Sequence, residues 1–223
     1  MIYAVYGLLF GLLIPYMARR IAKIMSTTLA YAIVYLCKPI KNPKTKNNEK
    51  YVYLRKQVRN RSVVWGLICA ALSYAMYYKF GTSFIGFKLF FLWSLLLLTE
   101  IDYRIQMLPD MITVPLLIVG FVFAVMYGQW INVGESAVGA LIGYFLPVLA
   151  SLFVVWKNPS AFGGGDIKLF AAIGAWLGYV NLIYVVVGAA AVASVYAIVA
   201  RKRSLAFGPA IVLAAIIITF FNF

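Results

Sequence analysis

Runs of apolar residues, each close to the length needed to cross a bilayer, dominate this chain. Hydrophobic residues make up 65% of its 223 residues and charged residues only 12%, whereas a soluble domain is about half apolar and about a quarter charged. The seven longer runs are Ile2–Met17, Ser62–Tyr78, Phe84–Thr99, Met111–Tyr127, Ala137–Trp156, Asn181–Ala200 and Phe207–Phe221. The fold class that this pattern predicts is all-α, a polytopic membrane helix bundle.

An eighth apolar run, Ile167–Leu177, is about half as long as a normal membrane span. If it crosses the membrane, the cluster Arg201-Lys202-Arg203 falls on the inner side, as the positive-inside rule requires. If it only re-enters, that cluster falls outside. We therefore expect about eight transmembrane segments, one of them short, with both termini outside.

Positive charge is concentrated in one stretch near the N-terminus. Of the net charge of +14, much comes from twelve Lys and Arg residues between Arg19 and Arg61, where Glu49 is the one acid. Such loops mark the cytoplasmic side of a membrane and attract anionic lipid head groups. We expect a first transmembrane helix over 1–17, a basic cytoplasmic loop over 18–61 and a transmembrane core over 62–223. No nucleic-acid-binding motif accompanies the charge, so nucleic acid is not an expected partner.

The ionisable residues narrow the possible chemistry. The chain has no His and two cysteines, Cys37 and Cys69, which excludes Ser-His-Asp and Cys-His catalysis, His-ligated metals and a tetrathiolate zinc site. Carboxylates are then almost the only acid–base groups available to an enzyme. The six acids are Glu49, Glu100, Asp102, Asp110, Glu135 and Asp166.

A glycine loop, Gly163-Gly164-Gly165, directly precedes Asp166 at the start of the short apolar run. Three glycines disfavour a helix but allow tight turns and close approach of another chain. An acid at the mouth of a membrane helix is costly unless it functions or is paired. Asp166 could also simply cap the following helix. We favour a functional carboxylate whose direction is fixed by such capping.

A second acidic stretch follows the apolar run that ends at Thr99. Asp102 could pair with Arg104 or with another carboxylate, whereas Glu100 is expected among the lipid head groups. Asp110 comes after Pro109 and is expected to cap a helix that starts at Met111.

The expected topology places Asp102 and Asp166 at helix ends on the same side of the membrane. Two carboxyl groups held close together cannot both ionise comfortably, so they titrate as a pair. One can then act as a general base toward water and the other as an acid toward a peptide carbonyl. This pair needs neither a metal nor a nucleophilic serine.

Three ordered motifs resemble those of the type IV prepilin peptidases. Gly163–Lys168 with Ala171–Gly178 resembles the GxGD signature, Glu100–Pro115 the first aspartate motif, and Phe207–Ala210 the C-terminal Phe-Gly-Pro motif. The resemblance covers about 85–223 and implies a multi-pass enzyme of the inner (cytoplasmic) membrane. It implies aspartyl proteolysis at the cytoplasmic face by Asp102 and Asp166. The implied substrates are prepilins or pseudopilins, cleaved after the Gly that ends a short basic leader; the oligomeric state stays open.

The chain departs from the family in two places. Many members bind zinc through paired Cys-x-x-Cys motifs in the first loop, where this chain has only Cys37. Many also N-methylate the new N-terminus with S-adenosylmethionine, but the usual Ser-Phe-Leu-Asn-like run reads Leu12–Tyr16 here. We therefore expect no metal and no cofactor, with S-adenosylmethionine needed only if methylation is retained.

The remaining motif residues have supporting roles at most. The glycines Gly163, Gly164 and Gly165 could let a substrate strand approach the backbone. Lys168 could hold the charge of the aspartates, bind substrate or extend to the membrane boundary. Pro209 more readily shapes the entry to a helix than contacts substrate.

A non-enzymatic function is the alternative: a small transporter, or a protein that binds anionic lipid. Broken helices and glycine loops also build ion sites in transporters, usually near the bilayer midplane and within inverted repeats. In this chain both aspartates fall at helix ends on one side, and no repeat is evident. The peptidase is therefore the favoured function.

Overall fold

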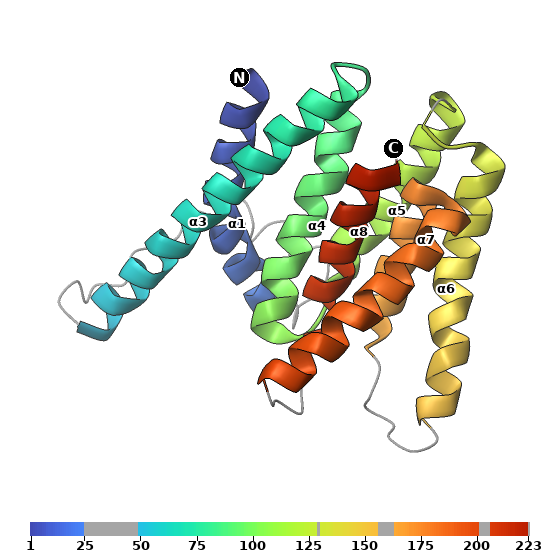
Figure 1. The fold of residues 1–223 in the computed structure, drawn as a ribbon. Coiled ribbons are helices and arrows are strands. Elements are labelled where there is room, and N and C mark those ends of the chain that lie inside the picture. The colour runs from blue at the N-terminus through green and yellow to red at the C-terminus, as the bar shows by residue number, and fades with distance from the viewer. Residues whose placement is uncertain (25–48, 129, 156–162, 201–205, 223) are drawn as a thin grey trace. The chain divides into compact units, whose positions relative to one another are not determined.

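The computed structural model describes residues 1–24, 49–128, 130–155, 163–200 and 206–222. Within these ranges every regular element is an α-helix (Figure 1), which confirms the predicted fold class. The chain divides into two compact units, Met1–Ile101 and Asp102–Phe223. The helices are α1 (Ile2–Ile24), α3 (Glu49–Phe80), α4 (Ile85–Ile105), α5 (Asp110–Met126), α6 (Val133–Val155), α7 (Gly164–Ala200) and α8 (Gly208–Asn222).

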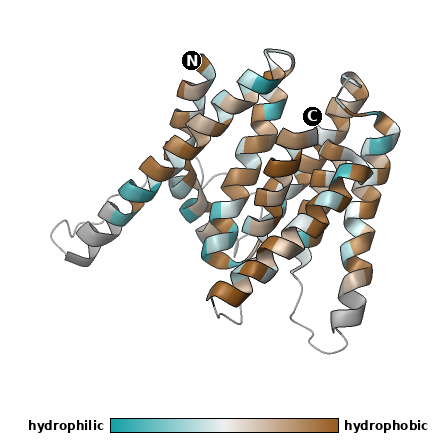
Figure 2. Cartoon of the chain, viewed as in Figure 1, coloured by the Kyte–Doolittle hydropathy of each residue, from teal (hydrophilic) through white to brown (hydrophobic). Residues whose placement is uncertain are grey.

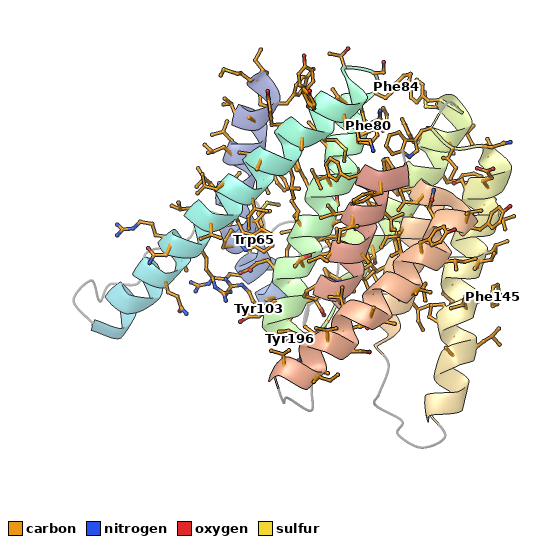
Figure 3. All side chains as sticks on the ribbon, viewed as in Figure 1. Trp65, Phe80, Phe84, Tyr103, Phe145 and Tyr196 are labelled. Carbon is orange, nitrogen blue, oxygen red and sulfur yellow. The ribbon has the colours of Figure 1, made fainter. Side chains whose placement is uncertain are left out.

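Several of these helices have the length and composition of membrane spans. Figure 2 shows mostly apolar residues along α1, α7 and α8. Large apolar side chains also point outward: Phe145 on α6 and Tyr196 on α7 are 54% and 51% exposed (Figure 3). Among the described residues, four spans are long and apolar enough to cross a membrane: Ile2–Ala22, Gln57–Phe80, Val133–Ala150 and Gly164–Val199. The chain is a multi-pass membrane protein, and the total of eight segments stays a prediction.

The first helices extend into the range expected to be a loop. Helix α1 continues past Arg19 and Arg20 to Ile24, and α3 begins at Glu49, well before the apolar run that starts at Ser62. Straight-chain polar residues such as Lys, Arg, Glu and Gln are good helix formers, so a helix can continue beyond its apolar part. Cys37 lies outside the described residues.

Small residues allow α1 and α3 to approach closely in the first unit. A Cβ on Gly7 would collide with the Cys69 carbonyl. One on Gly11 would collide with the Trp65 carbonyl in the same way. Gly7 and Gly11 therefore permit close contact between the two helices.

Glu100 was predicted to lie among the lipid head groups, and this prediction is wrong: the side chain is buried within the first unit. It is only 2% exposed and accepts hydrogen bonds from Arg61 at 3.2 Å and from Trp65 Nε1 at 2.9 Å. A buried carboxylate is costly unless it is paired, and both partners come from α3. Glu100 thus ties α4 to α3, a structural role.

In the second unit, α7 packs against α5, α6 and α8 (Figure 1). The α6–α7 contact depends on glycine, because a Cβ on Gly139 would collide with the Gly174 carbonyl, and one on Gly143 with Phe170. These small residues let the two helix backbones approach closely.

Helix α7 is broken at Gly178, whose φ of 78° and ψ of 171° are not helical. The break separates the short apolar segment, which was predicted to end at Leu177, from the longer second half of the helix. Every residue from 169 to 178 is buried. The short half is therefore the centre of this unit, surrounded by protein on all sides.

Side chains compensate for the backbone bonds that are lost at the break. The last carbonyls of a helix have no partner within it and must find one elsewhere. Three donors bond the carbonyl oxygens just before the break: Ser136 Oγ to Ala175 at 2.7 Å, Trp130 Nε1 to Trp176 at 3.0 Å, and Asn181 Nδ2 to Leu177 at 2.9 Å.

Trp176 also fastens the short half of α7 to α5. Its side chain is 1% exposed, and its Nε1 donates to the Leu116 carbonyl at 2.8 Å. Its ring stacks on that of Phe123 at a centroid distance of 5.5 Å. The indole fits because Gly120 has no Cβ, which would otherwise overlap the ring.

We predict that Gly178→Ala destabilises the protein by about 1–3 kcal/mol, because this combination of φ and ψ is essentially closed to residues with a Cβ. The melting temperature of purified protein in detergent measures the effect. Gly134→Ala is the matched control, since a Cβ there meets nothing within 4 Å. Equal melting temperatures for the two variants would contradict the prediction.

Candidate active site

Asp102 lies in the last turn of α4, beyond the apolar run that ends at Thr99. Its side chain is buried, at 4% exposure, and its Oδ2 accepts a hydrogen bond from the backbone N–H of Gly208 at 2.8 Å. The bond joins residues 106 positions apart in the sequence. Asp102 is therefore held at the N-terminus of α8.

The start of α8 directs a single backbone donor toward this carboxylate. Gly208 is the first residue of the helix, Pro209 has no N–H, and the Ala210 N–H already bonds the Phe207 carbonyl at 3.0 Å. A Cβ on Gly208 would come within 2.7 Å of Asp102 Oδ2. Only glycine allows this approach without displacement of the carboxylate.

Two effects on the Asp102 carboxyl oppose one another. Burial raises its pKa, because the charged form loses its hydration, and the hydrogen bond from Gly208 acts in the opposite direction. The carboxyl is thus desolvated but retains a donor that stabilises its negative form.

Asp166 is the third residue of α7, not its N-cap, so the predicted capping role is wrong. The helix begins at Gly164, and the Asp166 N–H donates to the Gly163 carbonyl at 3.0 Å. The Asp166 side chain is half-buried and interacts electrostatically with that of Asp102. The structure thus brings together the two aspartates that the sequence singled out.

The three glycines before Asp166 have different surroundings. A Cβ on Gly165 would overlap Leu108, at 2.8 Å from its Cβ and 3.2 Å from its backbone nitrogen. A Cβ on Gly163 would lie 3.3 Å from Asp166 Oδ2, and one on Gly164 would meet nothing within 4 Å. Gly165 is therefore needed for the first turn of α7 to pack on the segment that precedes α5.

Asp110 and Lys168 form an ion pair, with Lys168 Nζ at 2.7 and 2.6 Å from the two Asp110 oxygens. Asp110 does not cap a helix that starts at Met111. Helix α5 begins at Asp110 itself, its N-cap is Pro109, and no side chain makes a capping bond. The pair joins the first turns of α5 and α7, next to the contact between Gly165 and Leu108.

The Phe-Gly-Pro motif also contacts α7. The Phe207 ring lies 6.2 Å from the Phe170 ring, centroid to centroid, and Phe170 is one helical turn beyond Asp166. Pro209 is the second residue of α8, which agrees with its predicted role in the entry to a helix. The motif thus touches the helix that carries Asp166 and holds Asp102 directly.

Among the described residues, no group of three or more His, Cys, Asp or Glu side chains is arranged to hold a metal ion. What remains is a pair of interacting carboxyl groups with one backbone donor. Such a pair can share a proton and perform acid–base chemistry on water. The Gly208 donor was not predicted from the sequence, although a Gly-Pro pair at the start of an apolar run could have indicated it.

Comparison with known proteins supports this interpretation. A model of the type IV leader peptidase family matches residues 89–198, a range that includes both aspartates. A prepilin leader peptidase/N-methyltransferase of Dichelobacter nodosus is 35% identical over 153 residues, which cover 66% of this chain and 53% of that protein. One from Aeromonas salmonicida (strain A449) is 35% identical over 132 residues, or 55% of this chain and 44% of that protein.

A protein of the same name from Escherichia coli (strain K12) is 34% identical over 160 residues, which cover 68% of this chain and 70% of that protein. The chain thus spans about half the length of the first two relatives and more of the third. No solved structure matches it significantly. With two thirds of a relative covered at this identity, and with the family motifs around both aspartates, the chain belongs to the type IV leader peptidase family.

Proposed function

We propose that this protein is a membrane-embedded aspartyl endopeptidase that removes short basic leaders from prepilin-like proteins, cleaving after Gly. The observation that carries the proposal is the pair of interacting carboxyl groups, Asp102 and Asp166, with Asp102 held by the Gly208 N–H. The names of the relatives support the same reaction and substrate class.

In the proposed reaction, one carboxylate removes a proton from water as the water oxygen bonds to the peptide carbonyl carbon. The other carboxyl group gives its proton to the carbonyl oxygen, which produces a neutral tetrahedral diol. The carbon–nitrogen bond then breaks, the nitrogen takes up the proton held by the first carboxyl group, and a hydroxyl proton returns to the second. Both carboxyl groups end as they began, without a covalent intermediate.

The proposed peptidase reaction uses no cofactor. The relatives are also named N-methyltransferases, and a methyl group on the new N-terminus of the product would require S-adenosylmethionine. The mass of the mature substrate reports the cleavage position and any methylation in one measurement.

We also propose that the protein lies in the inner membrane with its aspartates at the cytoplasmic face. The charge around the start of α3 supports this orientation, since basic residues flank the cytoplasmic ends of membrane helices. Arg55, Lys56, Arg59 and Arg61 lie at one end of its apolar part, whereas the other end carries a single basic residue, Lys79.

Cysteines placed at the two ends of α3 should react from opposite sides of the membrane. Gln57 and Tyr78 are both exposed. In a background without Cys37 and Cys69, an impermeant maleimide added to intact cells should label Tyr78→Cys but not Gln57→Cys. Permeabilised cells, in which both should react, are the control. Labelling of position 57 in intact cells would reverse the proposed orientation.

Asp102→Asn and Asp166→Asn should each reduce cleavage at least about a hundredfold, because one carboxyl group cannot serve as both acid and base. The double variant should be no worse than either single one, since groups that act as a unit are not additive. The assay is the mass of a co-expressed prepilin-like substrate, with enzyme amounts checked by blot.

Glu135→Gln is the matched control, since Glu135 is an exposed carboxylate in the first turn of α6. It should process substrate at the wild-type rate. Full processing by a well-expressed Asp102→Asn protein would refute the two-aspartate mechanism.

Removal of the Asp110–Lys168 pair should have a much smaller effect. The side chains are 58% and 41% exposed, and exposed ion pairs contribute about 0.2–1 kcal/mol. We expect Asp110→Asn and Lys168→Gln each to lower the cleavage rate less than about tenfold, and the double variant to match the single ones. Initial rates on purified substrate test this; a loss as large as that of Asp166→Asn would place the pair in the chemistry itself.

A further inference from the structure

The two aspartates have different surroundings, and the difference assigns their roles. Asp102 Oδ2 accepts the Gly208 N–H at 2.8 Å at the N-terminus of a helix, where the backbone favours negative charge. Asp166 also lies in the first turn of a helix. Among the described residues, the backbone N–H that bonds one of the two aspartate carboxyl groups is that of Gly208, and it bonds Asp102.

Like charges at close range prevent both groups from being ionised together, so one proton is shared over the working pH range. The group with the direct donor keeps the negative charge. We infer that the Gly208 N–H makes Asp102 the base that activates water and leaves Asp166 as the acid that protonates the peptide carbonyl. This assignment rests on the proposed function and deepens it, with Gly208 as a positioning residue.

Other charged groups nearby do not explain this asymmetry. Helix α8 has no ionisable side chain, and on α5 the charge of Asp110 is paired with Lys168 of α7. On the same helix as the held aspartate, Glu100 is bonded to α3 and Arg104 lies two positions away in sequence. The directed donor that distinguishes the two carboxyl groups is a backbone N–H.

At the start of α8, the Gly208 N–H is the backbone donor that points to Asp102. Pro209 removes the next N–H, and Ala210 uses its own within the turn. Phe207 packs on Phe170, one turn beyond Asp166. The first turn of α8 therefore contacts α7, which carries Asp166, while its Gly208 N–H bonds Asp102.

Replacement of Gly208 by glycolic acid, through nonsense suppression during cell-free synthesis into nanodiscs, tests the assignment. The resulting ester removes the N–H and adds no side chain. The matched control is the same ester at Gly134, a helix-start glycine whose N–H donates to Asn132 Oδ1 at 3.4 Å, away from the aspartates. The readout is kcat/KM against pH for cleavage of a prepilin-like substrate.

The assignment predicts which limb of the pH profile moves. A hydrogen bond to a charged group is worth about one pKa unit. If the singly ionised pair carries its charge on Asp102, loss of the donor raises the pKa of the ascending limb by about one unit and leaves the descending limb unchanged. If the charge is on Asp166, the descending limb rises instead. A shift of the descending limb, or no shift, would overturn the assignment.

A second measurement does not depend on activity. The chain has three aspartates, Asp102, Asp110 and Asp166, so aspartate labelled with ¹³C at the side-chain carboxyl gives three signals, assigned with single Asn variants. In the wild-type protein, at a pH between the two limbs of the pH profile, the Asp166 signal should be that of a protonated carboxyl and the Asp102 signal that of a carboxylate. The reverse would overturn the assignment. Failure of the wild type to cleave any prepilin-like substrate would instead refute the proposed function.

Discussion

In apolar surroundings, backbone polar groups must find hydrogen-bond partners within the protein. The second unit is built around the break in α7, where the helix itself cannot supply these partners. At Gly178 the helix α7 breaks, and side chains from the α5–α6 connection, α6 and α7 itself bond the freed carbonyl oxygens. The break permits a short buried half-helix, held by α5, α6 and α8. Asp166 is therefore carried by a packed helix although three glycines directly precede it.

The Asp102–Gly208 bond likewise gives a partner to a backbone polar group at the end of a helix. The start of a helix has unpaired N–H groups, and a carboxylate is one of the partners that can satisfy them. Here the partner is a carboxyl group from a helix far away in the sequence. The bond satisfies a helix terminus and orients a functional group at once. The Asp102 carboxyl group is thus held by a backbone N–H of α8, and the Asp166 carboxyl group is carried by the helix whose following residues are buried.

The all-helical membrane fold, the short segment and the two aspartates could be predicted from the sequence, because each leaves a local pattern: an apolar run, a run of half length, or an acid beside glycine. Contacts across the chain leave no such pattern. Glu100 was expected among lipid head groups because its apolar run ends beside it, but its partners Arg61 and Trp65 lie on another helix. Likewise, Asp110 was assigned a local cap, while its partner, Lys168, lies 58 positions away. The Gly208 donor is a backbone group, which side-chain motifs do not report.

The space around Gly208 has a consequence for the family as a whole. Every other amino acid adds a Cβ, which would come within 3.0 Å of the Asp102 side chain at three atoms. Relatives that keep both aspartates but carry another residue at this position must therefore place the first carboxyl group differently. In such sequences, intact aspartate motifs would not by themselves show that this arrangement of the Asp102 carboxyl group is kept.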